Sequence, residues 1–476
     1  MELLEKLARY AAGDMCPMHM PGHKRADQGG GLPWELDITE IDGFDNLHDA
    51  QGILKAGMER AARLYGSRRA FFLVGGSTCG ILAGICAAAR PGDTVLLPRG
   101  CHKSVYHALE LRDLRPVYLP VPVDEEFGVA GSLRPETVAA ALAAHPEAKL
   151  VIVTSPTYEG VVSDVAAITA LAHEAGVPVL VDEAHGAHLG LAPWLPGGAV
   201  AAGADLVIQS AHKTLPSLTQ TALAHWNSNL VPEAEFARQL AIFETSSPSY
   251  LLMGSLDHCY ALLEEGGAAL WEEYRENLEG FDCRTASLRH LRLLCHGGDQ
   301  GAGHPDFFAF DPGKIVISTR RTNLTGPGLM DLLRHEFHIE LEMAQADYAL
   351  AMTSLCDTPE SLDRLARALL AIDRILSAAA PLPLVPACPL PRQRLSIRQA
   401  REAEGRLAAE EQTAGQICGE MVWAYPPGIP LLVPGEEITD RALETLRAMA
   451  ARGVALHAER SCPPGTLWVV KKPAHG

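Results

Sequence analysis

The chain has 476 residues, of which 47% are hydrophobic and 21% charged, and its formal net charge at pH 7 is −18. This length exceeds what one hydrophobic core usually supports, so we expect more than one domain. The composition excludes disordered, collagen-like and coiled-coil proteins. The acidic charge disfavours binding to nucleic acid or to anionic membranes.

Residues 1–50 are expected to form an irregular, polar N-terminal arm, because MPGHKR (20–25) and DGFDNLHDA (42–50) are rich in turn-forming residues. The first residues contain acids and no long apolar run, which is unlike a signal peptide. Eleven cysteines without CxxC spacing indicate free thiols. We therefore expect a cytoplasmic protein.

From about residue 68 to 230, short apolar strands alternate with helical segments. The expected strands are 70–74, 94–98, 116–121, 149–155, 177–182, 205–210 and 221–226, with helices at 78–89, from 104, at 135–145 and at 164–175. The uncharged stretch 71–89 has the length of a membrane span, but its central Gly-Gly-Ser-Thr would leave polar groups unsatisfied in lipid. Apolar runs without strict alternation predict a mostly parallel, seven-stranded α/β sheet between helices.

Beyond residue 250, long helical stretches at about 254–280 and 361–379 flank strand-like runs at 307–311 and 314–319. A Pro-rich linker (381–391) follows, and then a smaller α+β segment that contains a charged, solvated helix at 399–411. We expect four parts along the chain: the arm 1–50, a large domain 51–310, a small α+β domain 311–380 and a C-terminal domain 381–476.

Polar residues follow several of the expected strands, at the edge of the sheet where ligands bind. Lys213 follows strand 205–210, and a lysine in an enclosed pocket can form an imine with an aldehyde. Asp182 ends strand 177–182, where a carboxylate can keep a pyridine nitrogen protonated. The loop 75–78 lies between a strand and a helix, a place typical of phosphate binding. Together they predict pyridoxal 5′-phosphate (PLP) as cofactor, with His102 stacked on its ring.

Six motifs make the sequence resemble the Orn/Lys/Arg decarboxylases of the PLP-dependent aspartate-aminotransferase fold, above all the short, bacillus-type arginine decarboxylases. The motifs are MPGHK (20–24), PRGCHKS (98–104), SPTYEG (155–160), VDEAHGAH (181–188), SAHKTLPSLTQ (210–220) and YPPGIPLLVPGE (425–436). The resemblance implies decarboxylation of arginine, lysine or ornithine to the amine and CO2. It also implies that 51–310 binds PLP, that 381–476 is the decarboxylase C-terminal domain, and that the protein is a homodimer or higher oligomer with shared active sites.

The resemblance also implies residue roles. Lys213 would be the Schiff-base lysine, Asp182 the partner of the pyridine nitrogen, and His102 the residue stacked on the ring, opposite Ala184. The other residues implied to contact the cofactor are Gly76, Ser77, Thr78, His185, Ser210 and His212. Thr245 and Ser246 belong to the segment 245–250, which would reach the neighbouring subunit's phosphate.

The sequence departs from the family pattern twice. Gly76-Ser77-Thr78 stands where GTS is common, and Thr214-Leu215-Pro216 stands where glycines often follow the lysine. The hydroxyls survive the first change. The second alters the loop next to the lysine and leaves the choice among basic amino acids open.

Several alternatives remain open. The proton delivered to Cα can come from His102 or Lys213, and the candidates for binding a cationic side chain are Asp45, Glu436 and Glu437. Asp182, His185 and His188 also form a DxxHxxH pattern, but beside a cofactor lysine we expect no metal site. His23 and Lys24 either contact the active site across a dimer or belong to an exposed arm, and Cys79 and Cys101 are expected to be buried, inert thiols.

Two other functions use the same pattern. A PLP-dependent aminotransferase or Cα–Cβ lyase would share the lysine, the aspartate and the phosphate loop. A regulatory homologue without activity would keep the fold alone, although the intact Lys213 and Asp182 argue against it.

Overall fold

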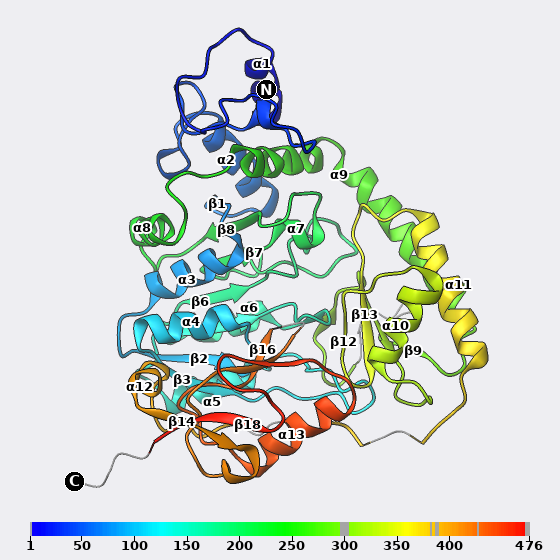
Figure 1. Cartoon of the computed structure of the whole chain (residues 1–476). Coiled ribbons are helices and arrows are strands. Elements are labelled where there is room, and N and C mark those ends of the chain that lie inside the picture. Colours follow the sequence, from blue (N-terminus) through cyan, green and yellow to red (C-terminus); the bar gives the residue numbers. More distant parts are fainter. Residues whose placement is uncertain (1, 296–303, 381–382, 386–389, 426–427, 472–476) are drawn as a thin grey trace. The chain divides into compact units, whose positions relative to one another are not determined.

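Figure 1 shows the computed structural model of the chain, which describes residues 2–295, 304–380, 383–385, 390–425 and 428–471. The chain divides into two compact units, each built from separate stretches of sequence. Unit 1 comprises residues 1–88, 165–274 and 354–356, and unit 2 comprises residues 89–164, 275–353 and 357–476. The predicted Pro-rich linker and the Pro426-Pro427 turn lie partly or wholly outside the described residues.

Helices alternate with strands through the first half of the chain, as the apolar pattern predicts. The α-helices are α1 (Leu3–Ala11), α2 (Ile53–Tyr65), α3 (Gly76–Ala88), α4 (Lys103–Arg112), α5 (Pro135–Ala144), α6 (Val165–Glu174), α7 (Ala211–Thr214), α8 (Glu233–Phe243), α9 (Tyr250–Thr285), α10 (Gly326–Phe337), α11 (Pro359–Ile375), α12 (Ile397–Glu402) and α13 (Asp440–Ala451). Short 3₁₀ turns are η1 (Trp34–Leu36), η2 (Leu47–Asp49) and η3 (Glu410–Gln412).

The strands of the predicted sheet are all present. They are β1 (Arg69–Leu73), β2 (Thr94–Pro98), β3 (Arg115–Leu119), β4 (Leu150–Thr154), β6 (Val179–Asp182), β7 (Leu206–Gln209) and β8 (Ala222–Trp226). The remaining strands are β5 (Val161–Val162), β9 (Arg292–Leu293), β10 (Ala309–Phe310), β11 (Lys314–Ser318), β12 (Met343–Ala344), β13 (Tyr348–Met352), β14 (Gly405–Ala409), β15 (Val422–Ala424), β16 (Ile429–Leu432), β17 (Leu456–Ala458) and β18 (Thr466–Val470).

The seven-stranded sheet has the strand order β1-β8-β7-β6-β4-β2-β3. In unit 1, β6 and β7 run parallel, whereas β8 is antiparallel to both β1 and β7. In unit 2, β2 runs parallel to β3 and β4. The α/β fold class with a mostly parallel sheet and a separate α+β C-terminal part is therefore confirmed. The stretch 71–89 forms most of β1, a turn and α3, and no described helix has the length and apolarity to span a bilayer.

The sequence prediction was wrong at three places. The arm begins with a helix, α1, because Leu3 and Leu7 give it a fully buried face. The run 307–311 contributes only two strand residues, which pair with β5. The charged run 399–411 is not one helix: α12 ends at Glu402, and β14 then pairs with β18.

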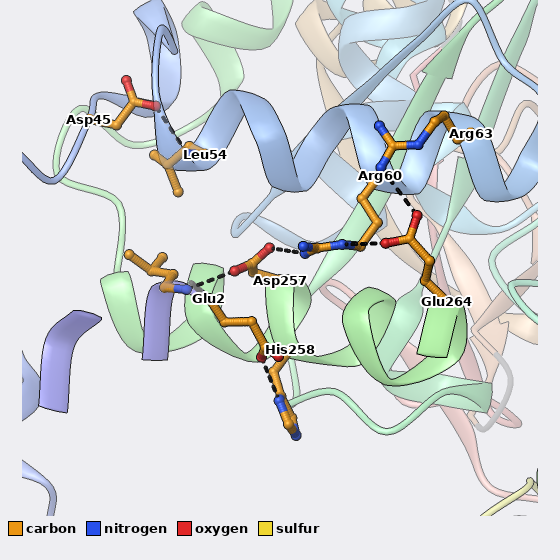
Figure 2. Close-up of polar contacts among 9 residues, drawn as sticks. Glu2, Asp45, Leu54, Arg60, Arg63, Asp257, His258 and Glu264 are labelled. Carbon is orange, nitrogen blue, oxygen red and sulfur yellow. Dashed lines mark hydrogen bonds and ion pairs between the residues drawn. The ribbon is translucent and has the colours of Figure 1, made fainter. Parts of the chain in front are cut away.

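Helix α1 is held against α9 by polar contacts at its first turn (Figure 2). The Leu3 amide donates to Asp257 Oδ2 at 2.8 Å, and His258 Nδ1 lies 2.8 Å from Glu2 Oε2. Arg60 on α2 donates to Asp257 at 2.7 Å and to Glu264 at 3.0 Å. The start of the arm is therefore an ordered part of unit 1.

Unit 2 holds two further cores. A four-stranded sheet in the order β12-β13-β11-β9 packs around buried apolar residues such as Phe310 and Val316. The C-terminal region pairs β14 with β18 and orders three strands as β16-β15-β17, around residues such as Val422 and Leu446. The C-terminal region and the four-stranded sheet of unit 2 therefore each have a hydrophobic core of their own.

Candidate functional site

Lys213 and Asp182 lie at the ends of two adjacent strands of unit 1. Asp182 is the last residue of β6, and Lys213 lies in the one-turn helix α7 that follows β7. Asp182 is 5% exposed, and burial raises the pKa of its carboxyl, while Lys213 and the Ala184 amide, 3.2 Å from Oδ1, act to lower that pKa. Lys213 and the Ala184 amide therefore both favour the ionised form of this buried carboxyl, which is the form that pairs with a protonated pyridine.

Lys213 also contacts a histidine of the VDEAHGAH motif. Its Nζ lies 3.0 Å from His185 Nε2, and His185 is 8% exposed. An ammonium group has only donors, so His185 accepts at Nε2. The contact places His185 beside the lysine, where a positive charge would oppose binding of a metal ion in the DxxHxxH pattern.

The implied phosphate ligands Ser77 and Ser210 are brought together. The Ser210 hydroxyl donates to Ser77 Oγ at 2.9 Å, and Ser77 and the exposed Thr78 lie in the first turn of α3. That helix begins at Gly76, whose φ of +75° favours glycine. Two adjoining hydroxyls at the N-terminus of a 13-residue helix fit a phosphate group.

His212 can offer a hydrogen-bond donor to a phosphate only under one condition. Its Nδ1 lies 2.7 Å from the Thr221 carbonyl oxygen, so this nitrogen carries the hydrogen and donates it. Burial lowers the pKa of His212, and Lys213 lowers it further. A neutral His212 has no second N–H, so it can donate to a phosphate only when a nearby anion keeps the ring protonated.

Glu244 was missed by the sequence reasoning and holds the loop 75–78, which is predicted to bind phosphate. Its carboxylate accepts from the amides of Val74, at 3.3 Å, and Gly75, at 3.0 Å, and from the Cys79 thiol at 2.6 Å. A Cβ on Gly75 would lie 3.0 Å from Glu244 Oε1, so the carboxylate packs closely against this glycine. Its only sequence signal was its place directly before the segment 245–250.

Thr245 and Ser246 are both exposed and follow the end of α8. The Thr245 carbonyl accepts from His48 Nε2 at 2.8 Å, and the Thr245 hydroxyl accepts from the Ser247 amide at 3.2 Å. Thr245 and Ser246 thus present their side chains outward, whereas Pro248 and Tyr250 of the same segment are buried.

His102 belongs to unit 2 and caps α4. Its Nδ1 accepts from the Ser104 amide at 3.2 Å, so Nε2 carries the hydrogen of a neutral ring. A Cβ on Gly428 would lie 3.6 Å from His102 Nε2. Gly428 of the motif YPPGIPLLVPGE therefore lies beside Nε2 of His102.

The three acids considered for binding a cationic side chain already have structural partners. Asp45 accepts from backbone amides at the start of α2 (Figure 2) and, although burial acts the other way, these bonds leave its pKa lowered. Glu436 is fully buried and pairs with Arg99 at 3.0 Å. Glu437 pairs with Arg394 at 2.5 Å.

The polar arm and the two cysteines behave as ordinary structural groups. His23 Nε2 lies 3.1 Å from Asp37 Oδ2, and Lys24 donates to the His19 carbonyl at 2.5 Å. Cys79 and Cys101 are both buried, and burial together with Glu244 raises the pKa of the Cys79 thiol. Cys79 is therefore protonated and unreactive.

A buried hydrogen-bond chain crosses β6, β7 and β8 beside these strand ends. Gln209 Nε2 donates to Glu183 Oε2 at 2.7 Å, and His225 Nε2 lies 3.0 Å from Gln209 Oε1. Ser67 Oγ lies 2.9 Å from His225 Nδ1, and the Ala199 amide donates to Glu183 Oε1 at 2.7 Å. Glu183 directly follows Asp182, and Gln209 directly precedes Ser210. The hydrogen-bond chain therefore holds the two strand ends that carry Asp182 and Ser210.

Comparison with known proteins places the chain in a family. The Orn/Lys/Arg decarboxylase major domain matches residues 3–316, and the C-terminal domain of the same decarboxylases matches residues 391–455. The chain belongs to the Orn/Lys/Arg decarboxylase family. The arginine decarboxylase of Bacillus subtilis (strain 168) is 33% identical over 482 residues, which cover 98% of this chain and 97% of that protein. The likeness to bacillus-type members is thus confirmed.

More distant Orn/Lys/Arg decarboxylases and other enzymes share the fold. The lysine decarboxylase LdcA of Pseudomonas aeruginosa is 23% identical over 560 residues, covering 91% of this chain and 73% of that protein. The crystal structure of the Francisella novicida lysine decarboxylase LdcF matches with a TM-score of 0.80 at 19% identity, covering 99% of this chain and 81% of that chain. An alanine–glyoxylate aminotransferase from Nostoc sp. matches with a TM-score of 0.52 at 18% identity, over 69% of this chain and 88% of that chain.

Proposed function

We propose that this decarboxylase of basic amino acids uses PLP and acts on arginine in preference to lysine and ornithine. The observation that carries the proposal is the grouping in unit 1 of Lys213, the buried Asp182 and the paired hydroxyls of Ser77 and Ser210. The preference for arginine is supported by the identity to the B. subtilis arginine decarboxylase over nearly the whole of both chains.

The residues of unit 1 fit the three functional groups of PLP. Lys213 would bind its aldehyde carbon, Asp182 its ring nitrogen, and Ser77, Thr78 and Ser210 its phosphate. Gly76, Ala184, His185 and His212 complete the proposed contacts. When bound, PLP supplies an electron-accepting ring that stabilises the charge left at Cα as CO2 departs.

The chain's own residues would control this chemistry through protons and charge. Asp182 is buried, so its ionised carboxylate would keep a cationic ring nitrogen paired. His185 lies 3.0 Å from Lys213 Nζ and can hold a proton for it. For this reason we assign to Lys213 the delivery of the proton to Cα. We assign to His102 the stacking on the ring.

We further propose a cytoplasmic homodimer with shared active sites, in which Thr245 and Ser246 contact the phosphate bound by the other subunit. The exposed side chains of both residues support this assignment. We also retain the four-part division: the arm 1–50, the PLP-binding domain 51–310, the small domain 311–380 and the C-terminal domain 381–476.

The experiment offers purified, PLP-loaded protein equal amounts of arginine, lysine and ornithine, and identifies the products by mass spectrometry. The proposal expects the amine of arginine in excess over those of lysine and ornithine. Formation of a keto acid would favour an aminotransferase. Absence of any product would favour the regulatory homologue and contradict the proposal.

A further inference from the structure

The loop 75–78 and the segment 210–221, which carries Lys213, meet at one end of the strand pair β1 and β8 in unit 1. These antiparallel strands pair as far as Leu73 and Ala222. Beyond this pair, β1 continues into the loop 75–78, whereas β8 is entered from the segment 210–221. The segments that carry the proposed ligands of the phosphate and of the aldehyde therefore start from neighbouring backbone positions.

Gln220 bridges the two segments at this point. Its side-chain Nε2 donates to the carbonyl oxygen of Val74, a residue that is 1% exposed and lies 146 positions earlier in the sequence. A Cβ on Gly76 would lie 3.8 Å from the Gln220 carbonyl oxygen, so the backbone of Gln220 also lies next to the loop. The φ of Gln220 is +83°, a left-handed conformation that a non-glycine residue keeps only where its surroundings fix it.

The peptide group between Val74 and Gly75 is held at both ends. Its carbonyl accepts from Gln220, and its N–H, that of Gly75, donates to Glu244 Oε1 at 3.0 Å. Because a peptide group is planar, bonds to its two opposite ends fix its orientation. This peptide directly precedes Gly76, where the chain turns into α3. The orientation of the loop thus depends on Gln220 as well as on Glu244.

The residue after Gln220 is tied to the neighbour of Lys213. The Thr221 carbonyl accepts from His212 Nδ1 at 2.7 Å and from the His212 amide at 3.4 Å, and His212 directly precedes Lys213. Thr221 is fully buried, and its hydroxyl donates to the Leu218 carbonyl at 2.7 Å. A short path of bonded groups therefore runs from the loop 75–78 through Gln220 and Thr221 to the lysine.

We propose that Gln220 is a positioning residue that sets the distance between the loop 75–78 and Lys213. The inference rests on the proposed use of PLP, whose phosphate and aldehyde would meet these two segments at once. A ligand held at two points binds more tightly when both points are already in place, because the second contact then costs little further ordering. Gln220 acts through the Val74 carbonyl and is assigned no contact with the cofactor.

The test compares binding of PLP with binding of pyridoxal, which has the aldehyde but no phosphate. Gln220→Met keeps the length of the side chain and removes its donor, and Gln220→Gly also relieves the positive φ, which favours folding of that variant. Full-length protein freed of PLP is titrated with each compound, and the visible band that borohydride abolishes is followed. Urea unfolding of the same samples checks the fold.

Both variants should raise Kd for PLP about 3- to 10-fold, the loss expected for one hydrogen bond, and change Kd for pyridoxal less than about twofold. The matched control is Gln28→Met, which removes another glutamine donor to a backbone carbonyl, that of Ala26 at 3.4 Å, in the exposed part of the arm. This control should bind both compounds as wild type does.

An unchanged Kd for PLP in both Gln220 variants, or an equal loss for PLP and for pyridoxal, would overturn the inference and leave the proposed cofactor intact. Wild-type protein that forms no such band with PLP would instead contradict the proposed use of PLP, and the inference with it.

Discussion

Replacing Gln209 with leucine removes the centre of the buried hydrogen-bond chain beside Asp182. In the native protein Gln209 donates to Glu183 and accepts from His225, and its side chain is fully buried. Because burial lowers the pKa of His225 to about 3, the ring is neutral and donates through Nε2. Leucine has a similar volume, so the change leaves one buried acceptor and one buried donor without partners and opens no large cavity.

The expected cost follows from these two groups. Each buried polar group left without its hydrogen bond costs about 1–3 kcal/mol, so Gln209→Leu should lower the free energy of unfolding by about 2–6 kcal/mol at pH 8. Burial raises the pKa of Glu183 to about 8, and the Gln209 amide acts to lower it. A carboxyl whose pKa is raised on folding contributes its full stability only below its ordinary pKa, 4.5 for Glu183, and this contribution is lost as the pH rises through the folded-state pKa. The cost should therefore be smaller at pH 5, where Glu183 is protonated in the folded protein.

The assay is urea unfolding of wild type and variants at pH 5 and pH 8, followed by circular dichroism. Glu183→Gln is the control, because the hydrogen bonds along the chain can reverse. The Gln209 side-chain amide can flip to accept from the new amide, His225 can change tautomer and Ser67 can rotate, so that each group keeps a partner. That variant should cost less than about 1 kcal/mol. If Gln209→Leu were as stable as wild type at pH 8, or if its loss of stability relative to wild type were larger at pH 5 than at pH 8, the hydrogen-bond chain would not have the role described.

Two further predictions concern Glu244 and the loop that it supports. Glu244→Ala should raise the dissociation constant for PLP about tenfold, because the Val74 and Gly75 amides lose the acceptor that shapes the loop. Equilibrium dialysis measures this constant. The control is Glu233→Ala, which removes an acid on α8 that pairs with Arg69 and should bind PLP as wild type does. Iodoacetamide at pH 8 should label the exposed Cys16 and leave Cys79 unmodified, because burial and Glu244 keep the Cys79 thiol protonated. Early labelling of Cys79 by peptide mapping would show that the loop opens.

The sequence predicted the seven strands and the residues at their ends because both depend on local pattern. Apolar runs bounded by Gly, Pro and Asp mark strands covered on both faces, and polar residues at their carboxyl ends have few structural reasons to be there. Asp182, Ser210 and Lys213 could therefore be named before the structure was known.

The residues that were missed act through contacts between distant segments. Glu244, for example, accepts from the backbone of Val74, which lies 170 positions earlier in the sequence. No spacing rule connects such pairs. Strand β13 was missed because its sequence YALAM is poor in β-branched residues, and it is held by pairing with β11 instead. Helix α1 was missed because the expectation for residues 1–50 rested on the turn-rich runs 20–25 and 42–50, although Leu3 and Leu7 already have helical spacing.

The central claim is that Lys213 binds PLP and that the protein releases the carboxyl group of arginine. Arginine labelled at the carboxyl carbon is incubated with wild type and with Lys213→Ala, each after addition of PLP, and the labelled CO2 is counted alongside the visible absorption of the bound cofactor. Wild type should release labelled CO2 and show a visible band that borohydride abolishes. Lys213→Ala should lack both; a variant that keeps the band, or a wild type that releases no label, would contradict the account.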